Sequence, residues 1–483
     1  MRSKTGSLLG LLCLTLPLAA QESAKGAAAR RQTTQELAIP LGGALHTAPV
    51  LREFLQRLSL LQAVDLALHQ NKSLEASLAL AKGSEAHTKS ARAGFLPSLN
   101  YAEAVTRGNN PVFVFSSLLA EHQFKADNFQ IGPLNRPKAL DNFRSSLVVR
   151  QTLFDGGLTK HDVRAGQALQ KAAATDVRRT ETEVTYAAAR AYLDAVLSDA
   201  SLTAAFEAVK SADADLQRAE NIHQAGMSTE ADVLSIRVHL ARVREKQIRL
   251  SAGATIARAA LNDALGQPLD SQYELTTPLT RSTPPPAALA AYEKDALDKR
   301  PDQLHLQFAT DLASAQLSRQ RSALLPIVSV EATLEADRQT FATRGGANWT
   351  VAATLNWNLF NGFRDRAQIE EAHQQLLSAK ATQERMASAV RLEVRRAWEE
   401  LRAAGRRIAV SEASVAQAEE SLRITKNRYQ AGLSPLTDLL RTEAEVLESR
   451  TEYLSALHDQ RLATVDLDVV SGALTPDSPS LKD

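Results

Sequence analysis

Few residues in this chain have the types and spacing that covalent or metal chemistry requires. The 10 histidines are scattered, and none lies in a His-Glu-x-x-His motif, a nucleophile elbow or a phosphate-binding glycine loop. The only cysteine is Cys13, in an apolar segment near the N-terminus, so the sequence offers no pair of thiols. We therefore predict that the protein is not an enzyme and has no cofactor and no metal site.

Two aspartates stand out by their placement. Asp232 and Asp438 each lie six residues after a glycine, Gly226 and Gly432, that interrupts two long helical segments. An aspartate in the first turn of a helix is favoured by the helix dipole, and this is one interpretation of both residues. Whether they do more depends on the elements that hold them.

These elements belong to an internal duplication with an offset of about 206 residues. The turn sequence from Leu153 to Gly157 recurs from Leu359 to Phe363, and Asn221 to Gly226 recurs as Asn427 to Gly432. Each copy has the same order: a helix, two strands, the Leu-Phe-(Asp/Asn)-Gly turn, a very long helix, an Ala-Gly turn and a returning helix.

The duplication sets the predicted boundaries. We place a first repeat at 59–266, with strands at 98–107 and 143–154 and a hairpin tip at 226. A proline-rich connector follows at 267–287. The second repeat lies at 288–472, with strands at 327–337 and 347–360 and a tip at 432, and a flexible tail lies at 473–483.

The N-terminus predicts export. Basic residues, a short apolar run and two alanines at positions 19 and 20 are typical of a signal peptide at 1–20. The following extension, 21–58, has no assignable role. The chain has 56 basic and 55 acidic residues, a balance that gives no reason to expect a nucleic-acid partner.

The long helices predict a coiled coil. From Gly157 to Ala225 there is no proline, which gives about 100 Å of continuous helix. In the second copy, large residues recur at every seventh position, alternating with small ones: Val394, Leu401, Ile408, Val415 and Leu422. This period specifies a left-handed antiparallel coiled coil with close backbones. Since the returning helix is much shorter, a second short helix has room to stack on its end, as in a tall hollow wall.

The strands predict a membrane barrel. Around Trp349 to Leu359 apolar and polar residues alternate strictly, as a barrel with lipid outside and water inside requires. Trp349 and Trp357 would lie at the two bilayer interfaces. Four strands cannot close a barrel, so several chains must combine. The long segment 108–142 between the first two strands is expected outside the cell.

Taken together, the repeat order, the turns and the paired tips resemble the TolC-like outer-membrane efflux proteins, the outer membrane factors. The resemblance implies a mainly helical fold with a β-barrel portion: a coiled-coil tunnel plus four barrel strands per chain, closing as a homotrimer with a 12-stranded barrel. It also implies a location in the outer membrane, with contact to its lipid and a tunnel projecting into the periplasm. The tip residues Ala225, Gly226, Met227, Ala431, Gly432 and Leu433 would contact a periplasmic adaptor, the membrane fusion protein, which is attached to an inner-membrane pump.

The resemblance also implies a gate. Asp438 matches the first gate aspartate of the family, whereas Arg441 stands where the best-known members have a second one. Two alternatives to an acidic ring therefore remain open. In the first, Asp232, and Asp438 paired with Arg441, form inter-helix ion pairs that hold the gate shut. In the second, the aspartates have only the helix-dipole role.

The predicted function is that of the outer-membrane channel of a tripartite efflux system that exports small molecules. The alternative is the outer-membrane component of a type I protein secretion system, because the same tunnel fold serves both. A periplasmic adaptor is less consistent with the sequence, since two duplicated hairpins with alternating strand pairs are not expected in an adaptor.

Overall fold

The structure is a computed structural model that describes residues 56–282, 287–343 and 345–482. The predicted signal peptide, Cys13 and all but the last three residues of the extension 21–58 lie outside the described residues. The rest belongs to one compact unit.

The two repeats have matching elements. The first contains α1 (Leu60–Gln70), α2 (Lys72–Arg92), β2 (Ser98–Gly108), β3 (Leu140–Phe154), α5 (Leu158–Gln224) and α6 (Glu230–Ala264). The second contains α7 (Leu289–Lys299), α8 (Pro301–Ser322), β5 (Ile327–Arg338), β6 (Gly346–Asn356), α9 (Arg364–Gln430) and α10 (Leu436–Val470). Helices α5 and α9 each have 67 residues, and α6 and α10 each have 35, so the duplication extends to the lengths of the hairpins.

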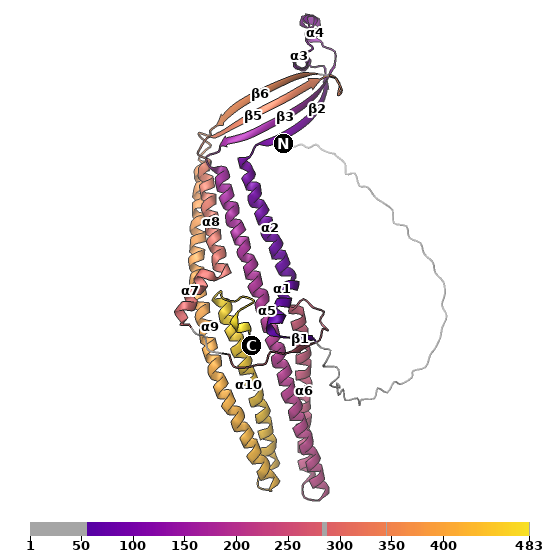
Figure 1. Cartoon of the computed structure of the whole chain (residues 1–483), viewed down its shortest axis with the longest axis vertical. Helices are drawn as coiled ribbons and strands as arrows, with labels where there is room; N and C mark the ends of the chain where they lie inside the picture. Colours follow the sequence, from indigo (N-terminus) through magenta and orange to yellow (C-terminus); the bar gives the residue numbers. More distant parts are fainter. Residues whose placement is uncertain (1–55, 283–286, 344, 483) are drawn as a thin grey trace, which may run out of the picture. The chain divides into compact units, whose positions relative to one another are not determined.

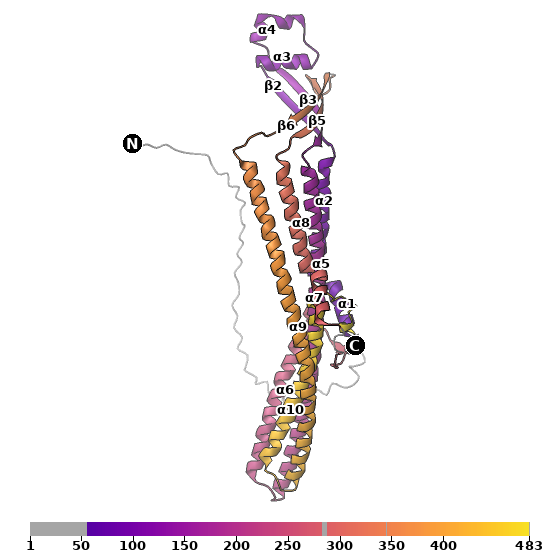
Figure 2. The ribbon, with the colours of Figure 1, turned by 90° about the vertical axis from the view of Figure 1, so that its left-hand side faces the viewer.

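The shorter helices pack along the two long helices, α5 and α9. Helix α2 lies along the half of α5 that is nearer the strands, and α6 lies along the other half (Figures 1 and 2). Helices α8 and α10 accompany α9 in the same way. Two short helices thus stack beside one long helix, as the lengths predicted. Among the described residues, no helix combines the length and the apolar character of a membrane span.

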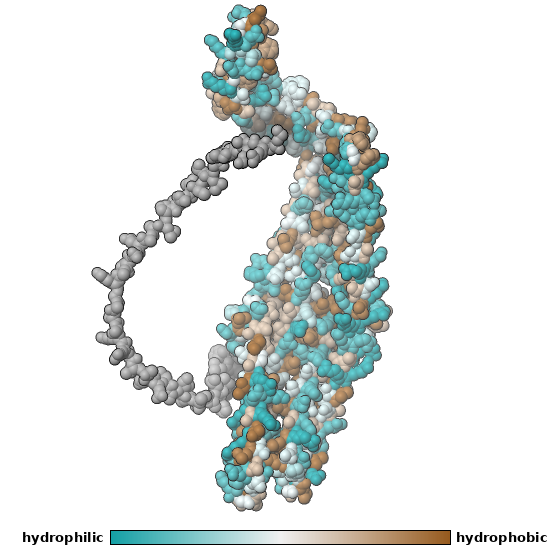
Figure 3. Space-filling view, turned by 180° about the vertical axis from the view of Figure 1, so that it is seen from behind, coloured by the Kyte–Doolittle hydropathy of each residue, from teal (hydrophilic) through white to brown (hydrophobic). Residues whose placement is uncertain are grey.

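The contacts between these helices use the predicted seven-residue seam. On α9 the buried residues are Ala372, Val390, Val394, Ala397, Leu401, Ala404 and Ile408. On α5 they are mostly small, with Ala188, Ala189, Ala195, Ala205 and Ala212 each almost fully buried. Small residues let helix backbones approach closely, which suits a thin wall better than a thick core. The face shown in Figure 3 is mainly hydrophilic, with scattered hydrophobic residues.

The strands form one antiparallel sheet in the order β2-β3-β5-β6 at one end of the helices (Figure 1). Strands β3 and β5 pair across the repeat boundary, so the two copies share the sheet. One register row joins Tyr101, Leu147, Leu334 and Trp349 on the apolar face. This face is open: Tyr101 is 67% exposed and Val351 is 61% exposed.

Two predicted strand boundaries differ from the structure by three residues or more. Strand β3 begins at Leu140, three residues before the predicted start. Strand β6 ends at Asn356, so the predicted strand 347–360 is too long. The indole Nε1 of Trp357 donates a hydrogen bond to the carbonyl of Leu324, 3.1 Å away, and this contact to the end of the preceding helix turns the chain out of the sheet.

The segment between β2 and β3 is largely helical. It contains α3 (Pro111–Ala120), a short 3-10 turn (Ala126–Phe129) and α4 (Ile131–Asn135). The rings of Phe115, Phe124 and Phe129 pack edge to face, with the centroids of Phe115 and Phe124 4.8 Å apart. The carbonyl of Ala120 accepts a hydrogen bond from the Asn348 side chain, which joins α3 to the end of the sheet.

A second core lies partway along α5, where the connector crosses it. Strands β1 (Gln56–Leu58) and β4 (Tyr273–Leu275) pair in parallel there (Figure 1). The same core includes Tyr192, Leu474 and Leu481, all almost fully buried. The expectation of a flexible tail at 473–483 was therefore wrong for residues 473–482, because two leucines anchor this segment to the core.

The turn before each long helix gives a matched test of packing. Gly156 and Gly362 occupy equivalent positions with φ of 66° and 71°. A Cβ on Gly156 would lie 2.8 Å from the Leu325 Cβ, whereas no described atom lies within 4 Å of the position on Gly362. Both alanine substitutions incur a left-handed backbone cost of about 1–2 kcal/mol. We expect Gly156→Ala to lower the thermal unfolding midpoint more than Gly362→Ala, and equal losses would contradict the packing argument.

Candidate channel gate and hairpin tips

Both hairpin tips end their outgoing helix in the same way. Gly226 and Gly432 have φ of 76° and 72°, a left-handed conformation that glycine adopts at little cost. The amides of Met227 and Leu433 donate to carbonyls five residues earlier, at 3.1 Å and 2.8 Å. This hydrogen-bonded helix ending is a Schellman motif. It explains why the Ala-Gly sequence occurs at both tips.

The residue after each tip glycine is apolar and uncovered. In a Schellman motif this side chain often packs back on the helix. Here Met227 is 74% exposed and Leu433 is 70% exposed. Ala225 and Ala431, which end the outgoing helices, are also exposed. The six predicted tip residues thus form two small apolar surfaces that nothing in the described chain covers.

The structure assigns Asp232 to a helix cap. Its backbone amide donates to the Thr229 hydroxyl at 3.2 Å, and its carboxylate accepts from the Thr229 amide at 3.1 Å. These reciprocal bonds form a capping box at the start of α6. Within the described residues Asp232 has no ion-pair partner, so the structure of one chain supports the helix-terminus interpretation.

Asp438 and Arg441 do not pair with each other in the described chain. Asp438 lies in the first turn of α10 and accepts a hydrogen bond from the Ser434 hydroxyl at 3.2 Å. Arg441 extends toward Glu445 on the same helix, with a nitrogen–oxygen distance of 3.8 Å. A lock made by an Asp438–Arg441 ion pair is therefore not present among the described residues, where the half-buried Asp438 carboxylate has no ion-pair partner.

The two tryptophans stand at different levels of the sheet. Trp349 lies within β6 and is 76% exposed, in the row that also holds Tyr101. Trp357 lies just past the end of β6 and is 56% exposed. Between them the outward positions of β6 are Val351, Ala353 and Leu355.

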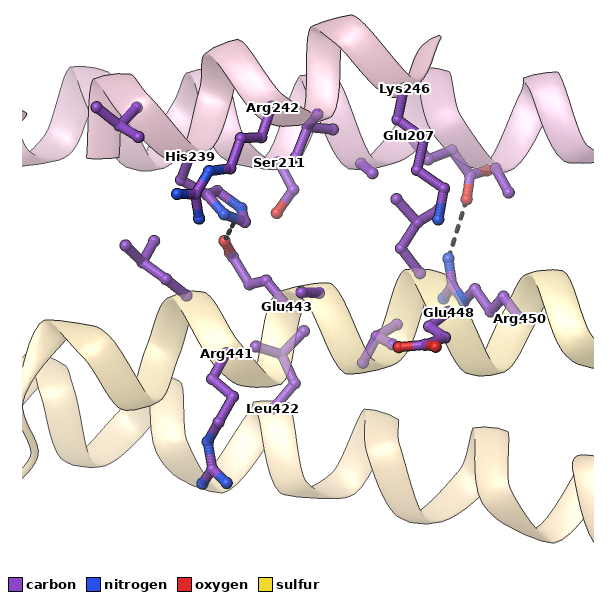
Figure 4. Close-up of a pocket in the computed structure, with 18 of the residues that line it drawn as sticks. Glu207, Ser211, His239, Arg242, Lys246, Leu422, Arg441, Glu443, Glu448 and Arg450 are labelled. Atoms are coloured by element: carbon purple, nitrogen blue, oxygen red, sulfur yellow. Dashed lines mark hydrogen bonds and ion pairs between the residues drawn. The ribbon is translucent and has the colours of Figure 1, made fainter. Parts of the chain in front are cut away.

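A buried polar network joins the two hairpins near their tips. No motif in the sequence indicated it. Asp215 on α5 contacts Lys426 Nζ on α9 at 3.1 Å and Arg218 at 3.3 Å. Glu443 on α10 lies 3.2 Å from His239 Nε2 on α6 (Figure 4). Helices α5 and α10 thus each contribute an acidic group and α9 and α6 each a basic one, while α5 also supplies Arg218.

The same face has other links between hairpins. Arg450 on α10 contacts Glu207 on α5 at 3.1 Å (Figure 4). It also contacts Glu419 on α9 at 2.7 Å. Further from the tips, His458 Nε2 lies 2.8 Å from Asp194. Burial opposes protonation of His458, but the hydrogen bonds and charges of Asp194 and Asp459 together outweigh it and raise the pKa of this histidine. A groove of about 780 Å³ lies between α6 and α10 at the level of Glu443.

These features define a class of protein: a channel subunit in which strand pairs with an open apolar face continue into long helical hairpins. The chain belongs to the outer membrane efflux protein family, whose model matches residues 63–267 and 293–473. The family consists of channel proteins of the outer membrane. The protein is therefore an outer-membrane efflux channel, as the resemblance implied.

Individual relatives are distant but cover most of the chain. The outer membrane efflux protein BepC of Brucella suis is 25% identical over 346 residues, which are 69% of this chain and 73% of BepC. The alkaline protease secretion protein AprF of Pseudomonas aeruginosa is 23% identical over 437 residues, 88% and 86% of the two chains. The crystal structure of VceC from Vibrio cholerae superposes with a TM-score of 0.73 at 19% identity, covering 86% of this chain and 96% of that chain. This likeness confirms the predicted fold class of helical tunnel and barrel strands.

Proposed function

We propose that three copies of the chain close around one axis into a trimer with a 12-stranded barrel. The sheet carries this proposal: in the described chain, β2 and β6 each have one edge without a partner strand. Unpaired edges and an exposed apolar face are unfavourable in water, and joining β6 of one copy to β2 of the next removes both edges. The long helices then continue the barrel as a tunnel into the periplasm.

The trimer is tested by membrane fractionation and gel mobility. We expect the protein in the outer-membrane fraction, migrating as a trimer before heating and as a monomer after it. The control is the same fraction boiled before loading. A water-soluble monomer would overturn the proposal.

The exposed tips support a proposal about partners. The apolar surfaces around Met227 and Leu433 lie at the end of the hairpins remote from the sheet (Figure 1). They suit a periplasmic adaptor whose own helical tips meet them, with an inner-membrane pump behind it. Substituting both residues with aspartate should abolish cross-linking to the adaptor while leaving the heat-resistant trimer intact.

The cargo is proposed to be small molecules. BepC is named for efflux and AprF for secretion of a protease, so relatives of both kinds match this chain. Deleting the gene should raise sensitivity to toxic small molecules and leave the secreted proteins unchanged. The opposite result would favour type I protein secretion.

We also propose that Asp438 narrows the tunnel near the tips. Its unpaired carboxylate in the first turn of α10, repeated in three copies, would place like charges around the axis. Replacing Asp438 with alanine should raise single-channel conductance in a planar bilayer, and Glu452→Gln, at an exposed acid further along the same helix, serves as the control with unchanged conductance. Unchanged conductance in Asp438→Ala would leave only the helix-terminus role.

A further inference from the structure

Helix α3 lies at the end of the sheet that is remote from the long helices (Figure 2). A Cβ on Gly108, the last residue of β2, would contact the Phe113 ring near the start of α3 at 3.4 Å. A Cβ on Gly346, the first residue of β6, would collide with the carbonyl of Ala120, the last residue of α3. Since β2 and β6 are the two edges of the sheet, α3 spans the sheet from edge to edge. It lies on the polar face, because the Asn348 side chain bonds to it.

One side of α3 is buried, and a charged residue belongs to it. Val114, Ser117 and Glu121 are spaced by three and four residues, which places them on one side of a helix, and all three are buried. Glu121 caps α3 with helical dihedral angles, φ −77° and ψ −5°, so it continues this side. A buried carboxylate is costly unless a cation or hydrogen-bond donors compensate it.

Glu121 faces two polar residues of the sheet, Asp337 on β5 and Asn142 on β3. Gly346, against which the end of α3 packs, pairs directly with Asp337. The Asn142 side-chain amide donates a hydrogen bond to Asp337 Oδ1 at 2.7 Å. Burial raises the pKa of Glu121, and the nearby Asp337 carboxylate raises it further, while Gln339 acts in the opposite direction. Three oxygen-bearing side chains from separate segments therefore meet under α3.

The oxygens at this place are incompletely satisfied. Four of them have no hydrogen-bond partner among the described residues: both Glu121 carboxyl oxygens, Asp337 Oδ2 and Asn142 Oδ1. Glu121 is 2% exposed, Asn142 is 3% exposed and Asp337 is fully buried. Arg144 forms an ion pair with Asp337, but its Nε approaches the other oxygen, Oδ1, at 3.0 Å. Two carboxyl groups thus face one guanidinium, and one negative charge in this part of the described chain is left over.

We propose that Glu121, Asp337 and Asn142 bind one calcium ion, which fixes α3 to the polar face of the sheet. Calcium takes about six to eight oxygen ligands in irregular geometry, from carboxylates, side-chain amides and water. The four free oxygens supply the protein ligands, and water completes the shell. The C-terminal end of α3 carries partial negative charge beside Glu121, which favours a cation there.

The net charge of the site predicts weak binding. Calcium affinity rises with the number of charged ligands, and sites of extracellular modules bind at about 0.1–1 mM. Two carboxylates beside one guanidinium belong in this weak range. The sequence predicted no metal site, because these ligands come from three separate segments and form no motif.

The location of the site rests on the proposed function, whereas its ligands do not. In the proposed barrel the polar face lines the lumen, so the ion would fix a helix inside the outer mouth, where the external medium supplies calcium. All ligands come from one chain, so calcium binding can be measured without channel activity. A water-soluble monomer that binds calcium would refute the channel and support the site.

The test is equilibrium dialysis of calcium against the purified protein in detergent, after removal of divalent cations with a chelator. We expect one calcium ion per subunit with a dissociation constant of about 0.1–1 mM. Glu121→Gln removes a charged ligand and should weaken binding at least about tenfold. Asp127→Asn removes an exposed acid from the same segment and should leave binding unchanged. No saturable binding to the wild type, or equal binding by Glu121→Gln, would overturn the proposal.

A variant with added charge gives a second measurement, which applies even if Glu121→Gln does not fold. Asn142→Asp exchanges an amide ligand for a carboxylate, so calcium should bind more tightly, and it should raise the thermal midpoint more than in the wild type. Potassium chloride at equal ionic strength serves as the control for screening. A smaller calcium response in Asn142→Asp, or an equal response to potassium, would contradict a calcium site.

Discussion

Replacing Ala353 with arginine is expected to prevent assembly in the outer membrane, whereas replacing the next residue, Thr354, should not. Ala353 lies midway between Trp349 and Trp357 and faces the same side of β6 as Val351. Thr354 pairs with Ser329 and faces the opposite side. An arginine on the lipid face near the bilayer midplane costs about 2–4 kcal/mol in each subunit, while one in the water-filled lumen costs little.

The measurement is the amount of heat-resistant trimer in outer-membrane fractions. Ala353→Leu is the control for size, because it adds bulk on the lipid face without charge and should assemble normally. Equal recovery of the Ala353→Arg and Thr354→Arg proteins would mean that the alternating residues of β6 do not separate lipid from water. The assigned faces of the barrel would then be wrong.

The architecture of the hairpins could be predicted because the signals are local and repeated. The absence of proline between Gly157 and Ala225 and the seven-residue seam on α9 fix helix type and length without knowledge of distant contacts. The tips were equally readable, since a glycine after a long helix predicts a left-handed helix ending. Duplication made each signal appear twice, so accidental matches could be set aside.

Element ends that depend on distant contacts were less accessible. The apolar/polar alternation continues past Asn356, but the strand ends there, and Trp357 instead bonds to the carbonyl of Leu324, just after α8. The tail was misjudged for a similar reason, since the partners of Leu474 and Leu481 are far away in sequence. Helix α3, in contrast, had a local signal, because Asn110 followed by Pro111 is a typical helix start.

The buried polar network between the hairpins shows where sequence reasoning about the site stopped. Asp215 lies on the buried seam of α5, three residues after Ala212 and four before Ala219. A charged residue at a seam position is unusual and could have been noticed. Its partner Lys426 on α9 could not, because this contact depends on how the two hairpins are aligned. The capping role of Asp232 was readable from Thr229 three residues earlier.

A second large effect is expected from Tyr192→Phe, which removes one oxygen atom from the core where the connector crosses α5. Tyr192 is fully buried, and its hydroxyl donates to the Leu58 carbonyl at 2.8 Å. It also accepts hydrogen bonds from the amides of Thr276 and Thr277, at 3.1 Å and 3.0 Å. One phenol thus holds β1, the residues after β4 and the middle of α5 together.

The phenylalanine variant keeps the packing of the ring but leaves the buried Thr277 amide without its acceptor. An unsatisfied buried donor costs about 1–3 kcal/mol, so the thermal midpoint should fall clearly. Tyr453→Phe is the matched control, because the Tyr453 hydroxyl has no hydrogen bond to any described residue. Hydrogen exchange of residues 273–279 should accelerate in Tyr192→Phe alone, since these amides would open without unfolding the long helices. Unchanged exchange there would show that β1 and β4, rather than Tyr192, hold the connector on α5.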